Sequence, residues 1–312
     1  MSGMGLGVMG AIRNGIFARD RGAYDRSVSF LCDALTEDPE NGRAHAELSI
    51  TLAAMNRRFG AIEEANRALS YAPNDPASHL ALALALLLID DTDGAEAANE
   101  RALQLDPMSV DALHLRCALA LRARDADALE TAATALRAAL PARADPFVSL
   151  ADAAILRGDA PVAEARAREA LALEAESAAA HVAIGEAFYL QRRFEDARDA
   201  GLSALSIAPE SAGAQKLLTD VGFSRRPVVG PLFRLTYRLE TIPAARLLTY
   251  VAIGFFLYSL SFDLMRYAGL REVAQALSFV GLAFGLSLFG MQMLQHRAMA
   301  RFRRQATLKR SY

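Results

Sequence analysis

The sequence predicts an all-α protein: a right-handed α-solenoid of about six helix pairs, followed by a C-terminal two-helix hairpin in a membrane. Three observations predict it. Small residues recur at fixed places in a repeat, and two uncharged apolar runs of 16 residues each lie near the C-terminus. Proline recurs every 34 residues, at Pro39, Pro73, Pro107, Pro141 and, after a miss at Ala175, at Pro209. We call residues 39, 73, 107, 141, 175 and 209 the proline positions of the six repeats.

The small residues define the repeated unit. Twelve residues before the proline positions stand Ser27, Ala61, Ala95, Leu129, Ala163 and Ala197; five residues before them stand Ala34, Ala68, Ala102, Leu136, Ala170 and Ala204. Small side chains at fixed places let two antiparallel helices approach closely, and a proline after the second helix ends it before the next repeat. Each repeat is therefore predicted to be a helix-turn-helix.

Further residues keep the same period. Leu48, Leu82, Leu150 and Ile184 stand 25 residues before the proline position, Gly15 and Gly185 stand 24 before it, and Leu35, Leu69, Leu103, Leu171 and Leu205 stand 4 before it. With these residues the chain resembles a tetratricopeptide-repeat protein over about residues 8–211. It departs from that family where His45, His79, Leu113, Phe147 and His181 replace a large aromatic residue, and where the fourth repeat carries Leu129 and Leu136 in place of Ala.

Charge divides the chain in two. Residues 1–224 hold 33 acidic and 21 basic residues, whereas residues 225–312 hold 3 acidic and 13 basic residues. We do not expect the repeats to bind nucleic acid, because phosphate neutralisation needs clustered Lys and Arg. The two cysteines, Cys32 and Cys117, lie in repeats too far apart to form a disulfide, which is typical of a protein in a reducing compartment.

The two apolar runs cover residues 247–262 and 276–291, and each extends to 19 residues if one polar residue at its end is tolerated. A bilayer span needs about 20 residues, with a range of roughly 17–25. We therefore expect a transmembrane hairpin over residues 247–294, between a basic amphipathic linker (225–246) and a basic tail (295–312). The alternatives are a pair of buried core helices for the hairpin and a helix resting on the last repeat for the linker. Residues 8–224 form the repeat domain, with a cap helix at its end.

The basic residues predict the orientation of this hairpin. Five arginines precede the first run and six basic residues follow the second, whereas the connecting loop holds two arginines. Because cytoplasmic flanks carry the excess of Lys and Arg, both termini are expected in the cytoplasm, and the first ten residues lack the features of a signal peptide. Arginine-rich, lysine-poor composition suggests a GC-rich bacterium, and hence its inner membrane. Gly281 and Gly285 form a GxxxG pair that would pack the two spans together or, alternatively, join two copies of the chain.

The sequence contains no recognisable active site. His45, His79 and His181 share one repeat position, so helix packing separates them by about 8–10 Å or more, which is too far for common metal ligands. We interpret them as rings filling space between helices. Motifs such as HExxH, CxxC or a glycine-rich phosphate loop do not occur. We therefore expect no enzyme activity, no cofactor and no metal.

The resemblance places the residues 27, 23, 20 and 19 before each proline position on the concave face of the repeats. These positions are mostly aliphatic, and an exposed apolar surface of this kind favours binding of a partner peptide or helix. A receptor for acidic chaperone tails is disfavoured, because Ile12, Ile16, Ala46 and Ile50 occupy the places of its charged clamp. The alternatives are internal packing of a tightly coiled solenoid and self-association. The predicted groove residues are ten residues at these positions and Leu115, which stands 26 before its proline position: Ile12, Ile16, Ile50, Leu80, Leu84, Leu87, Leu88, Leu115, Leu121, Val148 and Ile155.

These features predict a membrane-anchored scaffold or assembly adaptor that contacts lipid and binds a protein or peptide partner in its groove. Tethering raises the local concentration of whatever the groove holds, so a weak contact becomes effective. The alternative is a regulatory subunit of a membrane transport or secretion complex that acts mainly through its hairpin. A third hypothesis is an accessory subunit of an enzyme.

Overall fold

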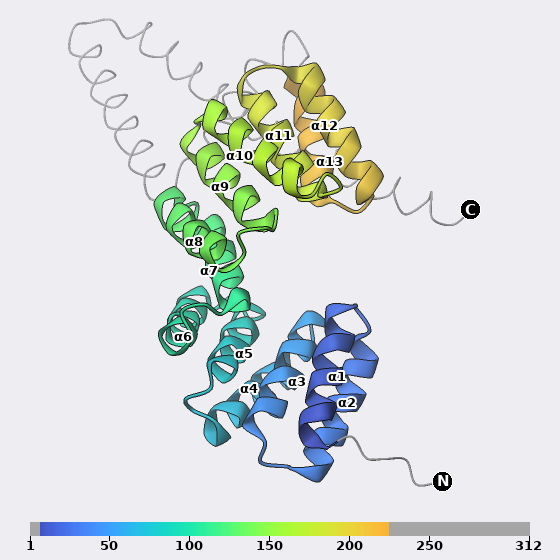
Figure 1. Ribbon diagram of the computed structural model, residues 1–312, viewed down its shortest axis with the longest axis vertical. Coiled ribbons are helices and arrows are strands. Elements are labelled where there is room, and N and C mark those ends of the chain that lie inside the picture. Colours follow the sequence, from blue (N-terminus) through green and yellow to red (C-terminus); the bar gives the residue numbers. More distant parts are fainter. Residues whose placement is uncertain (1–6, 225–312) are drawn as a thin grey trace, which may run out of the picture. The chain divides into compact units, whose positions relative to one another are not determined.

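The computed structural model describes residues 7–224, which form thirteen α-helices without a strand (Figure 1). None of these helices combines the length and apolar character needed to cross a membrane. The predicted linker, hairpin and tail, with Gly281 and Gly285, lie outside the described residues.

The helices alternate between the first and the second member of each repeat. The first helices are α1 (Val8–Asp20), α3 (Gly42–Ala54), α5 (Pro76–Leu87), α7 (Val110–Ala123), α9 (Asp145–Arg157) and α11 (Ala178–Leu190). The second helices are α2 (Tyr24–Glu37), α4 (Arg58–Tyr71), α6 (Thr92–Leu105), α8 (Ala126–Ala139), α10 (Ala160–Leu173) and α12 (Phe194–Ile207). Helix α13 (Ala212–Ser224) follows the sixth repeat. Every second helix ends two residues before its proline position.

The small residues lie where the helices touch, as predicted. All twelve side chains at the two small-residue positions are at most 1% exposed, including Leu129 and Leu136. Glycine is needed at the closest approaches: a Cβ atom on Gly15 would lie 2.7 Å from Cγ of Leu31, and one on Gly185 would overlap Leu217. The pairing of helices inferred from the period is therefore confirmed.

The turn inside each repeat has one recurring backbone conformation. The residue 17 before the proline position has a positive φ, between 55° and 76°, in all six repeats. Only glycine adopts this left-handed conformation without steric cost. These residues are Gly22, Asn56, Asp90, Arg124, Gly158 and Arg192.

The described chain divides into two compact units. Among the described residues, the N-terminal unit comprises residues 7–119 together with Ala138–Leu140, and the C-terminal unit comprises Ala120–Arg137 and residues 141–224. The division falls in the fourth repeat, which is also the repeat with Leu in both small-residue positions.

The first helices form one layer in each unit. Helix α3 packs on α1 and α5 in the N-terminal unit, and α11 packs on α9 and α13 in the C-terminal unit. Second helices of successive repeats make no comparable contact within either unit as described. The first helices therefore line the inner side of each unit. Helix α13 covers the end of the C-terminal unit and buries Leu217 and Val221 against Tyr189 and Ala197.

Candidate interaction surfaces

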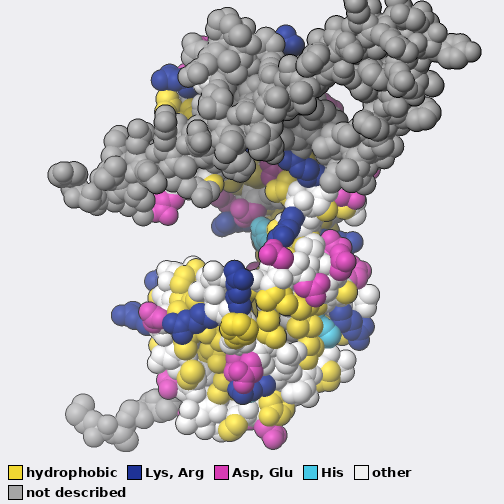
Figure 2. Space-filling view, turned by 180° about the vertical axis from the view of Figure 1, so that it is seen from behind, with side chains coloured by type: hydrophobic (Ala, Val, Ile, Leu, Met, Phe, Trp, Pro, Cys, Tyr) yellow, Lys and Arg dark blue, Asp and Glu magenta, His cyan; other side chains and the backbone are white. Residues whose placement is uncertain are grey.

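The predicted groove residues of the N-terminal unit divide into core and surface. Ile12, Leu80 and Leu115 are buried, and Ile12 packs against Leu31 and Leu48 in the core of the first repeats. A second group is half-buried on the inner layer. It consists of Ile16, Ile50, Leu84, Leu87 and Leu88, which we call the aliphatic row. Figure 2 shows that hydrophobic side chains gather on one face of this unit.

The predicted groove residues of the C-terminal unit are fewer. Ile155 is buried among Ala154, Ala163 and Ala187, whereas Val148 is half-buried and Leu121 is exposed. The structure therefore leaves a smaller accessible aliphatic surface here than in the N-terminal unit.

Acidic residues occupy the inner layer of the C-terminal unit. Asp152 on α9, Glu186 on α11 and Asp220 on α13 share one repeat position, 23 residues before the proline position or its equivalent in α13. Burial raises the pKa of the Asp152 carboxyl to about 8, with a smaller contribution from the charge of Glu186. Burial also raises the pKa of Glu186, while Lys216 and Arg124 lower it. A cation beside a carboxyl group with a raised pKa would stabilise the ionised form of that group.

The sequence held the signal for this acidic position. The groove position that carries Ile16, Ile50 and Leu84 in the first repeats carries Asp152 and Glu186 in the last two. The predicted groove therefore included the aliphatic residues at this position and omitted the acidic ones.

The N-terminal unit contains a chain of ion pairs around one buried carboxylate, which was not predicted from the sequence. Arg19 Nη1 lies 2.5 Å from Glu47 Oε2, and Arg43 bridges Glu47 at 2.8 Å and Asp75 at 3.3 Å. The Glu47 side chain is 3% exposed. Since a buried carboxylate is tolerated when it is fully paired, this chain links three repeats and has a structural role.

Three histidines connect the first helices α3, α5 and α11 to the loops before them. The Nε2 atoms of His45, His79 and His181 lie 2.9, 2.8 and 3.1 Å from the carbonyl oxygens of residues 39, 73 and 175, so Nε2–H donates to the proline-position carbonyl. Gln215 makes the equivalent bond to Pro209 at 3.3 Å. The interpretation of the histidines as structural residues agrees with this geometry. Within residues 7–224 no three His, Cys, Asp or Glu side chains lie close enough together to hold a metal ion.

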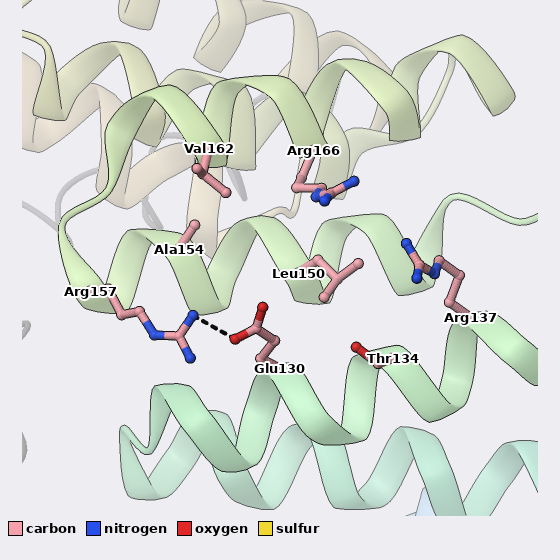
Figure 3. A pocket seen from close by; sticks show the side chains of 8 residues that line it. All are labelled: Glu130, Thr134, Arg137, Leu150, Ala154, Arg157, Val162 and Arg166. Carbon is pink, nitrogen blue, oxygen red and sulfur yellow. Dashed lines mark ion pairs between the residues drawn. The ribbon is translucent and has the colours of Figure 1, made fainter.

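A cleft that is open to solvent lies between α8, α9 and α10 of the C-terminal unit (Figure 3). Buried Leu150 and Ala154 form its apolar part. Arg157 Nη1 lies 2.6 Å from Glu130 Oε2 at one end. This site was not predicted from the sequence. Its lining residues are Glu130, Thr134, Arg137, Leu150, Ala154, Arg157, Val162 and Arg166.

Comparison with known proteins identifies the repeat. The tetratricopeptide-repeat profile matches residues 18–85, and no curated protein matches the chain. The fold is similar to three solved structures. One, a chain of the APC/C hetero-tetramer Cut9-Hcn1, is 16% identical with a TM-score of 0.59 over 69% of this chain and 43% of that chain. PilW, a type IV pilus biogenesis factor, is 18% identical with a TM-score of 0.56 over 67% and 96% of the two chains. A tetratricopeptide-repeat protein from Parabacteroides merdae is 18% identical with a TM-score of 0.52 over 68% and 82%.

These comparisons show tetratricopeptide repeats in residues 18–85 and the tetratricopeptide-repeat fold in the described part of the chain. The chain spans less than half the length of the Cut9-Hcn1 chain that it matches. The likeness to these structures, at 16–18% identity, concerns the fold.

Proposed function

We propose that this protein is a membrane-anchored scaffold or assembly adaptor, which binds a partner protein or peptide helix on the inner layer of its repeats. The aliphatic row carries the proposal: Ile16, Ile50, Leu84, Leu87 and Leu88 are half-buried on neighbouring first helices. Apolar side chains left accessible at helical spacing suit an amphipathic helix laid across them. The fold is shared with a chain of the Cut9-Hcn1 hetero-tetramer and with a pilus biogenesis factor, which supports a role in assembly.

The anchoring part of the proposal rests on residues 225–312. Their two apolar runs, the arginines outside those runs, and Gly281 and Gly285 support a hairpin in the inner membrane with both termini in the cytoplasm. A tethered groove meets membrane-bound partners at a high effective concentration. Binding without chemistry is sufficient for this role.

The test replaces one member of the aliphatic row in the full-length chain. Leu84→Glu should keep the helical circular dichroism spectrum and lose the partners that copurify with the wild type in mild detergent. Leu84 is half-buried, so the new carboxylate can reach water. Ala97→Glu, at an exposed position on second helix α6, is the matched control and should keep the partners. Ile50→Lys supplies a second variant from another repeat. Folded variants at both positions that retain every partner would remove the aliphatic row from the mechanism.

A regulatory subunit of a membrane transport or secretion complex is the second candidate, and the glycine pair in the second apolar run favours it. In that case residues 225–312 alone should copurify the same membrane proteins as the whole chain. The adaptor hypothesis instead requires the repeats.

A further inference from the structure

The repeats depart from their own pattern at two arginines. Arg137 stands 4 residues before its proline position, where the other five repeats have leucine, and Arg166 stands 9 residues before, where none of the other five has arginine. The equivalents of Arg137 are Leu35, Leu69, Leu103, Leu171 and Leu205, and those of Arg166 are Phe30, Glu64, Ala98, Ala132 and Ala200. Packing of the repeat therefore does not require an arginine at either position.

The fold brings both departures to one place. Arg137 on α8 and Arg166 on α10 line the cleft of Figure 3, together with Arg157 on α9. Three guanidinium groups from three helices thus surround a cleft whose lining includes one acidic residue, Glu130. This is unusual in a repeat region that has an excess of acidic residues.

The three arginines differ in how far they are already paired. Arg157 holds Glu130 and Asp127, each at 2.6 Å. Arg166 contacts Glu169 at 2.9 Å in an i,i+3 pair whose side chains are 36% and 45% exposed, and such a surface pair opens at little cost. Half-buried Arg137 has no hydrogen bond or ion pair to any residue of the described range. Arg137 and Arg166 are therefore available to a ligand, while Arg157 is already paired with two carboxylates.

We propose that this cleft is a binding site for an oxyanion, a carboxylate or a phosphate, attached to an apolar group. A guanidinium offers paired N–H donors that match the oxygens of either anion. The Thr134 hydroxyl is a further donor, and Leu150, Ala154 and Val162 provide the apolar contact. The site is distinct from the aliphatic row proposed for the protein partner, because none of the residues of that row lines the cleft.

The test is titration calorimetry of the full-length chain in a nonionic detergent with three probes of equal chain length: hexanoate, hexyl phosphate and hexylamine. At least one of the two anions should bind, and hexylamine should bind at least about tenfold more weakly, because the guanidinium groups repel it. Hexanoate and hexyl phosphate together distinguish a carboxylate ligand from a phosphate ligand. Anion binding should also weaken as salt is added.

Two variants restore the residue types of the other repeats and should therefore fold. Arg137→Leu and Arg166→Ala should each lower anion affinity by about tenfold or more. Arg198→Ala on α12, which removes the same charge from a 51% exposed side chain outside the cleft, should leave the affinity unchanged. Equal binding of hexylamine and the anions, absence of binding by both anions, or wild-type affinity in folded Arg137→Leu and Arg166→Ala would each overturn the proposal. If Arg137→Leu fails to fold, Arg166→Ala decides.

Discussion

At the scale of single residues, the turn inside each repeat requires a left-handed backbone at one residue, whatever the side chain of that residue. Gly158 meets this demand with a φ of 76° and open space where a Cβ atom would lie. Gly158→Ala should destabilise residues 1–224 by about 1 kcal/mol, because an L-residue pays roughly 1–2 kcal/mol in this region and regains part of that through lower chain entropy.

Gly222→Ala is the control of opposite sign for that prediction. Gly222 lies inside α13, has no atom within 4 Å of a built Cβ, and has no positive φ. Alanine there should stabilise the helix by up to about 1 kcal/mol. Chemical denaturation of the fragment 1–224 measures both changes. Equal stability of the two variants would contradict the assignment of strain to the turn.

A second prediction at this scale concerns Asp152. Burial raises its pKa in the folded protein to about 8, above the ordinary value. The contribution of Asp152 to the free energy of unfolding is therefore complete at acidic pH, and it is lost as the pH rises through about 8 and the buried carboxyl ionises. Asp152→Asn should therefore match the wild type near pH 4 and exceed it at pH 9 by about 1 kcal/mol or more, since one pKa unit corresponds to about 1.4 kcal/mol.

Asp199→Asn on α12 is the matched control for Asp152→Asn, because that side chain is 74% exposed. It should change the free energy of unfolding equally at both pH values. Denaturation of both variants at pH 4 and pH 9 tests the difference. If Asp152→Asn changed the free energy of unfolding by the same amount at pH 4 and pH 9, burial of this carboxyl would not control the pH dependence of stability.

At the scale of helices, the small-residue positions set how closely a pair can approach. Ala102 on α6 is fully buried, whereas Ala97 on the same helix is exposed. Ala102→Leu should overpack the interface and cost about 1–3 kcal/mol, while Ala97→Leu should have little effect. Denaturation of the fragment 1–224 compares them. Because neighbouring repeats are coupled, the loss can take the form of partial unfolding of the array. Equal stability of the two variants would contradict the repeat register.

The same helices show what the sequence can and cannot reveal. A period of 34 residues predicts the helix pairs and their buried alanines, because packing demands one residue type at those positions. It does not reveal the left-handed turn, since Asn56, Asp90 and Arg192 meet the same backbone demand with different side chains. Arg137 is visible as a break in a leucine series, but its convergence with Arg166 requires the packing of three helices. The burial that shifts Asp152 likewise arises from the assembled layer.

At the scale of the whole molecule, the charge of the chain is bipolar. The repeats carry an acidic excess, and residues 225–312 combine two uncharged apolar runs with 13 basic and 3 acidic residues. A cluster of arginines beside an apolar run favours the cytoplasmic side of a membrane, where anionic headgroups attract it. The apolar runs thus account for the proposed anchor, and the flanking arginines are the cause of its expected orientation.

This cause gives the last prediction. Reporters fused after Arg226 and at Tyr312 should both be cytoplasmic, and a reporter near Gly269 should be external, because the basic residues crowd the outer flanks and the connecting loop has few. Protease protection in intact spheroplasts, combined with the reporter activities, measures all three positions. Neutralising the basic residues that follow the second run should weaken retention of Tyr312 in the cytoplasm, whereas neutralising surface arginines of the repeats should not. The fragment 1–224 should be recovered without detergent, because it lacks the two apolar runs. An external reporter at Tyr312 in the unmodified chain would contradict the hairpin.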